Sequence, residues 1–290
     1  MIIMEVSVIN LYNDIAPPGK GFIADHGQSF YFAAESFKVL FDTGTNGKTL
    51  LHNMEIAGVD PNTIETVVLS HGHYDHTGGL RELLKKRITE HPLKIIAHPD
   101  VYSKKVRRKK KWFRKMFQDI GFPPMPEALI RKVSFTFTRD FYAINNVLFV
   151  TGEITERPYK AGISEYHFTK QSDKWLLDKM KDDMSLILKT KEGLVVFCGC
   201  CHAGLLNTLG AIRKHFPEEK FQAIVGGTHM YQFTRAEVAL VAKKLEESFD
   251  KPKLFFNHCS GLNTIELLKE LYSEKLVSDC LIGSKFVYDC

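Results

Sequence analysis

Residues 71–79 read HGHYDHTGG and place three histidines and one aspartate within six positions. The apolar run TVVLS at residues 66–70 comes directly before them and predicts a buried strand, whereas GGLRELL at residues 78–84 predicts the start of a helix. The polar residues therefore lie on a loop at the carboxyl end of a strand. Open α/β sheets usually place their chemistry at this end.

The spacing of these residues is typical of metal ligands. His71 and His73 are two positions apart, so in extended backbone they point the same way and can bind one cation together. Asp75 and His76 are adjacent and point apart, so they can reach a second cation beside the first. The chain has 12 histidines in 290 residues, and three of them within six positions are not expected by chance. We therefore predict that this loop binds metal.

The composition is that of an ordinary soluble protein, with 44% hydrophobic and 25% charged residues. A chain of 290 residues can form one large two-sheet domain or two smaller domains. It has no run of 18 apolar residues and no readable signal peptide, so we expect no membrane span and no export. Nothing indicates that the six cysteines form a disulfide framework. A cytoplasmic location is expected.

A basic segment at 100–124 is predicted to be an insertion. Residues 104–115 carry nine positive charges in twelve positions. Apolar residues recur through the segment at near-helical spacing, namely Tyr102, Val106, Phe113, Phe117 and Ile120. The pattern favours an amphipathic helix with a basic face. Such a face can simply be solvated, and three functions stay open: a lid over an anionic substrate, an RNA-binding patch or a membrane-surface helix.

The rest of the chain alternates predicted strands and helices in two similar halves. Strands are predicted at 2–10, 28–33, 36–41, 93–97, 131–138, 147–151, 184–189, 193–198, 221–225, 253–256 and 285–288. Helices are predicted at 49–58, 205–215 and 235–248, and residues 155–183 are predicted to be an irregular loop anchored by Trp175. This order predicts two mixed sheets that pack face to face with helices outside.

The stretch at 71–76 resembles the H-x-H-x-D-H signature of the metallo-β-lactamase-fold superfamily. The resemblance implies an α/β protein with a four-layered αβ/βα sandwich, in which the metals lie at one edge between the sheets. Residues 1–290 are then expected to form a single domain of this kind, with the basic helical insertion at about 100–124.

The resemblance also implies a set of metal ligands. Two further histidines follow predicted strands, and these are His202 in GCCHAG and His258 in NHCSG. His71, His73 and His202 are expected around one metal. Asp75, His76 and His258 are expected around the other. Zinc suits such an imidazole-rich set, with iron or manganese as alternatives.

Four more residues are implied to lie around the metals. Asp42, in the D-T-G motif, is expected to brace the histidine loop, and His26 is expected to face the metal site. His229 is expected to be catalytic, as a substrate or outer contact, together with Asp75, which could steer the proton of the nucleophile. Glu153 replaces the histidine of a Thr-x-Gly-His motif, and three roles stay open for it: ligand, outer brace or substrate contact.

Four motifs resemble one branch of the superfamily, named after a methanopterin-biosynthesis enzyme, a dihydropterin ribofuranosyl-aminobenzene-phosphate synthase. They are TGEI at 151–154, GCCHAG at 199–204, GGTH at 226–229 and HCSG at 258–261. Most two-metal members carry a bridging aspartate where this chain has residues 200–202, so a one-metal site stays open. Cys198, Cys200 and Cys201 lack the paired spacing of an iron–sulfur or structural zinc site and are expected to be small buried residues.

These expectations together predict a metal-dependent hydrolase that uses a metal-bound hydroxide on a small anionic substrate, such as a phosphorylated one. Two alternatives stay open: a pterin-type synthase of the methanopterin branch, and a ribonuclease or nucleic-acid binder that uses the basic insertion. A small-molecule partner is favoured over nucleic acid, and the sequence does not indicate the oligomeric state.

Overall fold

A computed structural model describes residues 4–111 and 114–290 of the chain, and its first sheet carries the histidine stretch. The strands of this sheet are β1 (Glu5–Tyr12), β2 (Ser29–Ala34), β3 (Phe37–Phe41), β4 (Thr66–Val68), β5 (Leu93–Ala97), β8 (Val133–Phe137) and β18 (Lys285–Asp289). Their order is β18-β1-β2-β3-β4-β5-β8, antiparallel as far as β3 and parallel from β3 to β8. Because Phe41 pairs with Val68, the residues that follow β3 lie beside the histidine stretch.

The second sheet carries the other predicted ligand segments. Its strands are β9 (Tyr142–Ala143), β10 (Leu148–Val150), β13 (Ser185–Thr190), β14 (Gly193–Cys198), β15 (Phe221–Gly226), β16 (Lys253–Phe256) and β17 (Val277–Asp279). Their order is β17-β16-β15-β14-β13-β10-β9, with β14 to β17 parallel. The segments after β14, β15 and β16 therefore leave the sheet at the same edge.

Successive apolar residues of the central strands point alternately to the two faces of the sheet, so each sheet is buried on both faces. In β2, Phe32 points into the core between the two sheets, where its ring lies edge-on to Phe197 of β14 at 4.7 Å. The neighbouring Tyr31 points into the opposite core, beneath the helices. Val196 of β14 likewise packs on the helices that cover the second sheet.

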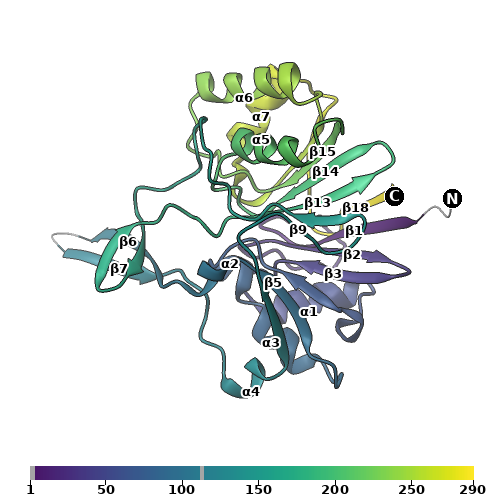
Figure 1. Cartoon of the computed structure of the whole chain (residues 1–290), viewed down its shortest axis with the longest axis vertical. Helices are drawn as coiled ribbons and strands as arrows, with labels where there is room; N and C mark the ends of the chain where they lie inside the picture. The colour runs from purple at the N-terminus through teal and green to yellow at the C-terminus, as the bar shows by residue number, and fades with distance from the viewer. Residues whose placement is uncertain (1–3, 112–113) are drawn as a thin grey trace.

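Helices cover the outer face of each sheet (Figure 1). Helices α5 (Leu205–His215), α6 (Arg235–Ser248) and α7 (Leu262–Leu271) lie on the second sheet, and α1 (Gly47–Ile56) and α3 (Leu80–Lys86) lie on the first. Shorter segments are α2 (Tyr74–Thr77), α4 (Glu127–Ile130) and the 3₁₀ turns Pro61–Thr63, Pro99–Tyr102 and His258–Ser260. The predicted four-layered αβ/βα sandwich is confirmed. No helix in the described ranges has the length and apolar character needed to cross a membrane.

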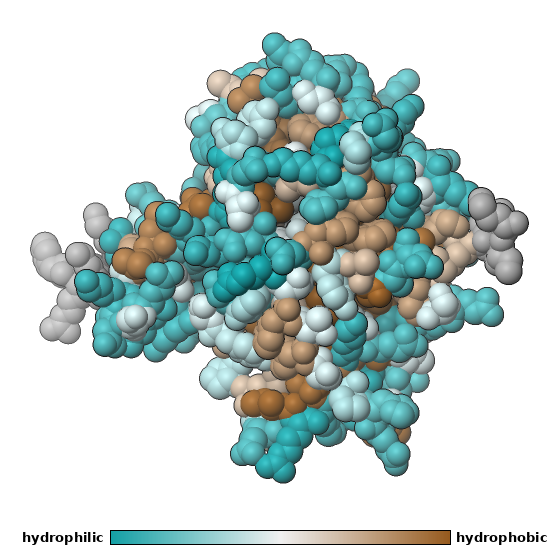
Figure 2. Space-filling view, viewed as in Figure 1, coloured by the Kyte–Doolittle hydropathy of each residue, from teal (hydrophilic) through white to brown (hydrophobic). Residues whose placement is uncertain are grey.

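A third, smaller sheet forms an arm that projects from one side of the body (Figure 1). Its strands are β6 (Lys105–Lys111), β7 (Arg114–Asp119), β11 (His167–Gln171) and β12 (Lys174–Leu177), in the order β12-β11-β6-β7. Figure 2 shows hydrophobic side chains on this arm among hydrophilic ones. The exposed apolar residues of the arm include Met116, Phe117, Leu176 and Leu177.

The prediction of a basic helix at 100–124 was wrong, because the described part of this segment forms a hairpin of β6 and β7. Residues 112–113, including Phe113 of the predicted apolar stripe, lie outside the described residues. The remaining apolar residues do not share one face: Tyr102 packs on Phe122, whereas Phe117 stacks on Trp175 of β12. Pairing with β11 therefore overrides the local helical pattern.

The prediction of an irregular loop at 155–183 was also wrong in part. Residues 167–177 form the hairpin of β11 and β12, and β11 pairs antiparallel with β6. Two segments far apart in the chain thus complete one sheet. Because the two segments are stabilised by pairing with each other, neither segment has a local sequence pattern that predicts its strands.

Candidate metal centre

The histidine stretch is held tightly at the carboxyl end of β4. His71 and His76 are fully buried, and His73 and Asp75 are almost so. The segment turns closely against its neighbours, since a side chain at Gly72 would lie 2.0 Å from the carbonyl oxygen of Val101. After His73 the chain forms the helical turn α2 rather than the predicted open loop.

His71 and His73 lie side by side, as their spacing predicted. Nε2 of His71 is 3.0 Å from Nδ1 of His73, and the two ring centroids are 4.6 Å apart. His202, from the segment between β14 and α5, reaches the same place. Its ring lies 4.9 Å from that of His71 and 5.2 Å from that of His73. The structure therefore brings these three residues together.

Asp75, His76 and His258 form a second group beside the first. The Asp75 carboxylate oxygen Oδ2 lies 3.4 Å from Nε2 of His258 and 3.8 Å from Nε2 of His76. The rings of His76 and His258 are 5.3 Å apart. The six predicted ligands thus meet from three distant parts of the chain.

Two of these imidazoles have a buried nitrogen with no partner. Nε2 of His73 and of His202 makes no hydrogen bond within the described residues, whereas Nε2 of His258 has the 3.4 Å contact with the Asp75 carboxylate. The other nitrogen of His202 bonds the carbonyl oxygen of Gly162 at 3.0 Å, and that of His258 bonds Asp14 at 2.9 Å. Leaving buried polar atoms unpaired costs free energy, so these atoms indicate a missing ligand. The arrangement fits divalent metal ions, because an imidazole ligand usually bonds an oxygen through its second nitrogen.

The electrostatic environment also suits metal binding. Burial lowers the pKa of His71, of His73 and of His202 well below the ordinary value of an imidazole. Burial alone would raise the pKa of Asp75, but the charge of His76 and hydrogen bonds from neighbouring histidines hold it well below its usual range. For these four groups the protonation states are those that metal ligands need. For His258, burial alone would lower the pKa, but the charge of Cys259 and the contacts with Asp14 and Asp75 raise it well above the ordinary value, so a metal would have to displace its proton.

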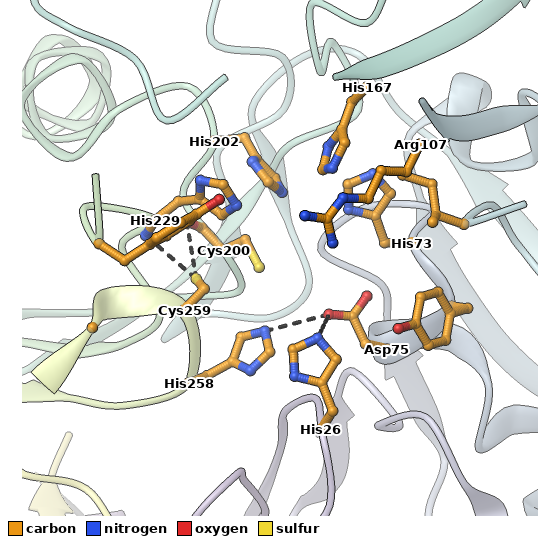
Figure 3. A pocket seen from close by; sticks show the side chains of 14 residues that line it. His26, His73, Asp75, Arg107, His167, Cys200, His202, His229, His258 and Cys259 are labelled. Atoms are coloured by element: carbon orange, nitrogen blue, oxygen red, sulfur yellow. Dashed lines mark hydrogen bonds and ion pairs between the residues drawn. The ribbon is translucent and has the colours of Figure 1, made fainter. Parts of the chain in front are cut away.

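Four of the six predicted ligands, namely His73, Asp75, His202 and His258, line a cavity of about 290 Å³ (Figure 3). His26 stands at its mouth, with its Nδ1 3.2 Å from Asp14 and its Nε2 3.2 Å from Asp75. These two contacts, with that to Asp14 the stronger, raise the pKa of His26 to about 9. His26 therefore faces the site, where it was expected.

His229 lines the same cavity beside His202. Its ring lies 4.2 Å from that of His202, and its backbone N–H donates to Sγ of Cys259 at 3.3 Å. The residue adopts a φ of 48°, which non-glycine residues rarely do. Burial lowers the pKa of His229 to about 3, so its side chain is a neutral hydrogen-bonding group at neutral pH.

The arm contributes two residues to the cavity, Arg107 of β6 and His167 of β11. They are direct partners across the two strands. The ring of His167 lies 5.3 Å from that of His73, and burial together with the charge of Arg107 lowers its pKa to about 4. Figure 3 shows the Arg107 guanidinium pointing into the cavity between His73 and Asp75.

Comparison with known proteins finds relatives of both the fold and the histidine stretch. The model of the metallo-β-lactamase superfamily matches residues 23–149. A crystal structure of a metal-dependent hydrolase of the β-lactamase superfamily superposes with a TM-score of 0.79 at 25% identity, over 97% of this chain and 98% of that one. The chain is thus similar in fold to members of the metallo-β-lactamase superfamily.

A curated relative matches nearly the whole chain. It is 7,8-dihydropterin-6-methyl-4-(β-D-ribofuranosyl)-aminobenzene-5′-phosphate synthase of Methanocaldococcus jannaschii, 27% identical over 93% of this chain and 92% of that protein. This match confirms the predicted resemblance to the methanopterin branch. A diphosphatase of the PhnP family, at 13% identity and a TM-score of 0.53 over 99% of each chain, shares the fold.

Glu153 lies apart from this metallo-β-lactamase-type cavity. Its carboxylate is 3.4 Å from Arg139 and 3.5 Å from His98, and it lines a different cavity beside α5. Three roles were left open for Glu153. Within residues 4–111 and 114–290, it makes no contact that supports the role of metal ligand.

Sequence reasoning missed several residues of the site. Cys200 lies among the predicted ligands, and the signal was its position just after β14, two residues before the predicted ligand His202. Arg107 and His167 gave no local signal, because they meet only through the pairing of β6 with β11. Asp14 was hidden in a loop, yet it bonds both His26 and His258.

Proposed function

We propose that the chain is a metal-dependent hydrolase that acts on a small anionic substrate in the histidine-lined cavity. The observation that carries this proposal is the pair of unpaired buried nitrogens on His73 and His202, which line one cavity together with Asp75, His258 and Arg107. Imidazole nitrogens of this kind suit a transition metal, and the guanidinium suits an anion.

Two divalent ions are proposed, with zinc first and iron or manganese as alternatives. His71, His73 and His202 would hold one ion, and Asp75, His76 and His258 would hold the other. Bound ions of this kind activate water and polarise the oxygen of the bond under attack. The chain's own groups then position the substrate and keep bulk water out.

The side chains around the ligands support this chemistry. Arg107 offers the planar donors that match a phosphate or carboxylate. His229 and His167, both held neutral, can exchange hydrogen bonds with the substrate without adding charge. Asp75, whose carboxylate is ionised, is proposed to steer the proton of the attacking water as well as to bind metal. Asp75 and His229 are thus the proposed catalytic residues.

A synthase activity on a pterin-like phosphorylated substrate is the second candidate. The observation that favours it is the match over 93% of this chain to the Methanocaldococcus jannaschii synthase. Its named product carries a phosphate, which Arg107 could bind in either reaction. Formation by this chain of the 5′-phosphate product that names the relative would favour the synthase.

A substrate panel with and without chelator tests the hydrolase. Phosphomonoesters, phosphodiesters, lactones and thioesters are offered to the metal-loaded and the chelated protein, each beside a neutral analogue. We expect turnover that needs metal and favours anionic substrates. Turnover that survives chelation, or that shows no preference for anions, would argue against the proposal. An RNA oligonucleotide in the panel, at several salt concentrations, tests the nucleic-acid alternative.

A further inference from the structure

We infer that Cys200 supplies a thiolate that is shared by two metal ions and so joins the two ligand groups into one dinuclear centre. This inference rests on the proposed metal-dependent function, because it assigns a role within the same site. It goes further by naming the bridging group.

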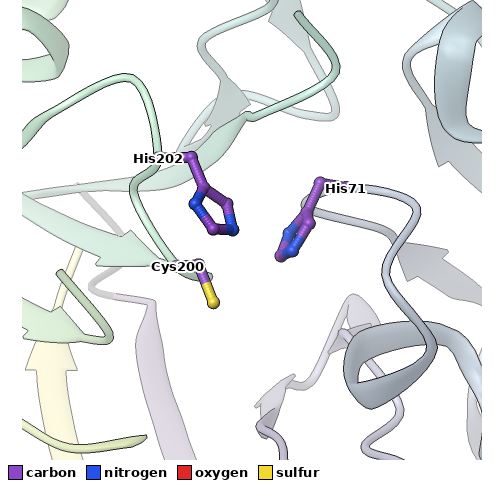
Figure 4. Close-up of side chains that lie close together, drawn as sticks. All are labelled: His71, Cys200 and His202. Carbon is purple, nitrogen blue, oxygen red and sulfur yellow. The ribbon is translucent and has the colours of Figure 1, made fainter. Parts of the chain in front are cut away.

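The geometry around Cys200 carries the inference. Its Sγ lies in two separate sets of three side chains whose ligand atoms are all within 4.8 Å of one another. One set is completed by His71 and His202, and the other by His76 and His258. Figure 4 shows Cys200 next to the rings of His71 and His202. Sγ of Cys200 is also 3.1 Å from Nε2 of His76.

The fold explains why the sulfur lies there. Gly199, just before it, has no room for a side chain, because a Cβ there would lie 2.2 Å from Oγ of Ser70. This close approach brings the end of β14 against the histidine stretch. Cys200 is 3% exposed and lines the cavity, whereas Cys198 and Cys201 pack in the core beneath the helices. The three cysteines therefore differ in environment, although they are nearly adjacent in sequence.

Independent atoms point to a ligand at the same place. His202 and His258 belong to the two different sets. Nε2 of His202 is buried without a hydrogen-bond partner, and the buried Nε2 of His258 has only a 3.4 Å contact with Asp75, itself a predicted ligand. The side chain of His258 is 1% exposed, and His202 is equally buried. One ion in each set would satisfy both nitrogens.

The charges also require an anion between the ions. Two divalent ions here would face only one carboxylate among the predicted ligands, that of Asp75. A thiolate at Cys200 adds a second negative charge where both ions can share it, and its proton is released to solvent when the metals bind. A thiolate is a soft ligand, so the centre should prefer zinc, cobalt or iron(II) to magnesium or manganese.

Titration of the metal-free protein with Co(II) tests the assignment. The wild type should develop a near-ultraviolet thiolate-to-cobalt charge-transfer band that grows until two ions are bound. Cys200→Ser should lose the band and bind about one equivalent fewer. Cys259→Ser is the matched control: this cysteine also lines the cavity but belongs to neither set, so the band should persist.

Cys200→Asp guards against a trivial loss of structure. A carboxylate can also bridge two ions, so this variant should bind two equivalents again while the charge-transfer band stays absent. Two bound cobalt ions in the wild type without the band would overturn the thiolate assignment, as would a band that persists in Cys200→Ser. A band that is complete after one equivalent would overturn the bridging role. If the wild type binds no cobalt at all, the proposed function fails as well.

Discussion

Oδ2 of Asp42 lies 2.7 Å from Nδ1 of His76, and neither side chain is exposed to solvent. The same carboxylate accepts hydrogen bonds from the backbone N–H and the hydroxyl of Ser70, each at 2.7 Å. The contact assigns the proton of His76 to Nδ1 and directs Nε2 toward Cys200. Asp42 thus fixes the orientation of the His76 imidazole, and we propose that this contact supports metal binding.

Asp42→Asn should weaken metal binding. The amide can donate to Nδ1 of His76 and so favour the wrong tautomer, and outer contacts of this kind are worth about 10–100-fold in metal affinity. Competition with a chelator of known affinity measures the effect. Asp173→Asn, at a fully exposed position, is the control. Equal affinity in Asp42→Asn and the wild type would show that the contact does not support the metals.

Arg107→Met should raise KM for anionic substrates about tenfold, because a charge-assisted hydrogen bond is lost. The metal content should stay unchanged, since Arg107 contacts none of the ligand groups described above. Steady-state kinetics on an anionic substrate and its neutral analogue provide the measurement. Lys109→Met, at an exposed position on the same strand, should have little effect. An equal loss on the neutral analogue would mean that Arg107 does not recognise the anion.

Lys105→Met should destabilise the fold by about 3–5 kcal/mol, because it leaves two buried carboxylates without their cation. Nζ of Lys105 lies 2.8 Å from both Asp178 and Asp182, and Asp182 also accepts from the backbone N–H of Gly72. Urea unfolding checks this, with the exposed Lys174→Met as control. A loss below about 1 kcal/mol, the range of exposed ion pairs, would show that the pair is solvated rather than buried.

The same lysine makes the free energy of unfolding depend on pH. Burial alone would lower the pKa of Lys105, but the charges of Asp182 and Asp178 raise it above the ordinary value of 10.5. The folded state therefore holds this proton more tightly than the unfolded state. The stabilisation should be complete below pH 10.5 and should decline only above it. Unfolding free energies of the wild type and Lys105→Met, compared from pH 7 to 10, should differ by a constant amount.

His26→Gln should remove a pH dependence in the metal-free protein. The contacts with Asp14 and Asp75 raise the pKa of His26 from 6.5 to about 9. Because the folded pKa is the higher one, its stabilisation is complete below pH 6.5 and is lost as the pH rises through 9. Thermal unfolding between pH 6 and 9.5 should show this decline in the wild type and in an exposed-site control, His91→Gln. A decline that is equally steep in His26→Gln would exclude His26 as its source.

The sequence predicted the parts that depend on local patterns. Helices α5 and α6 and strand β16 have the bounds that apolar periodicity indicated, because each forms around a local apolar stripe. The six predicted ligands also meet, since the ends of parallel strands share one edge. The arm could not be predicted, because β6 is stabilised by β11 rather than by its own spacing. The spacing of the cysteines predicted that Cys200 is a small buried residue. Its position just after β14 is what brings it among the predicted ligands.

Metal content tests the central claim most directly. The protein is purified from zinc-supplemented medium, dialysed, and analysed by inductively coupled plasma mass spectrometry beside His71→Ala and His202→Ala. We expect the wild type to retain a transition metal and each variant to lose at least part of it while still folding. A folded wild type that retains and rebinds no zinc, iron or manganese, or variants that hold metal as tightly as the wild type, would contradict the assignment of these histidines.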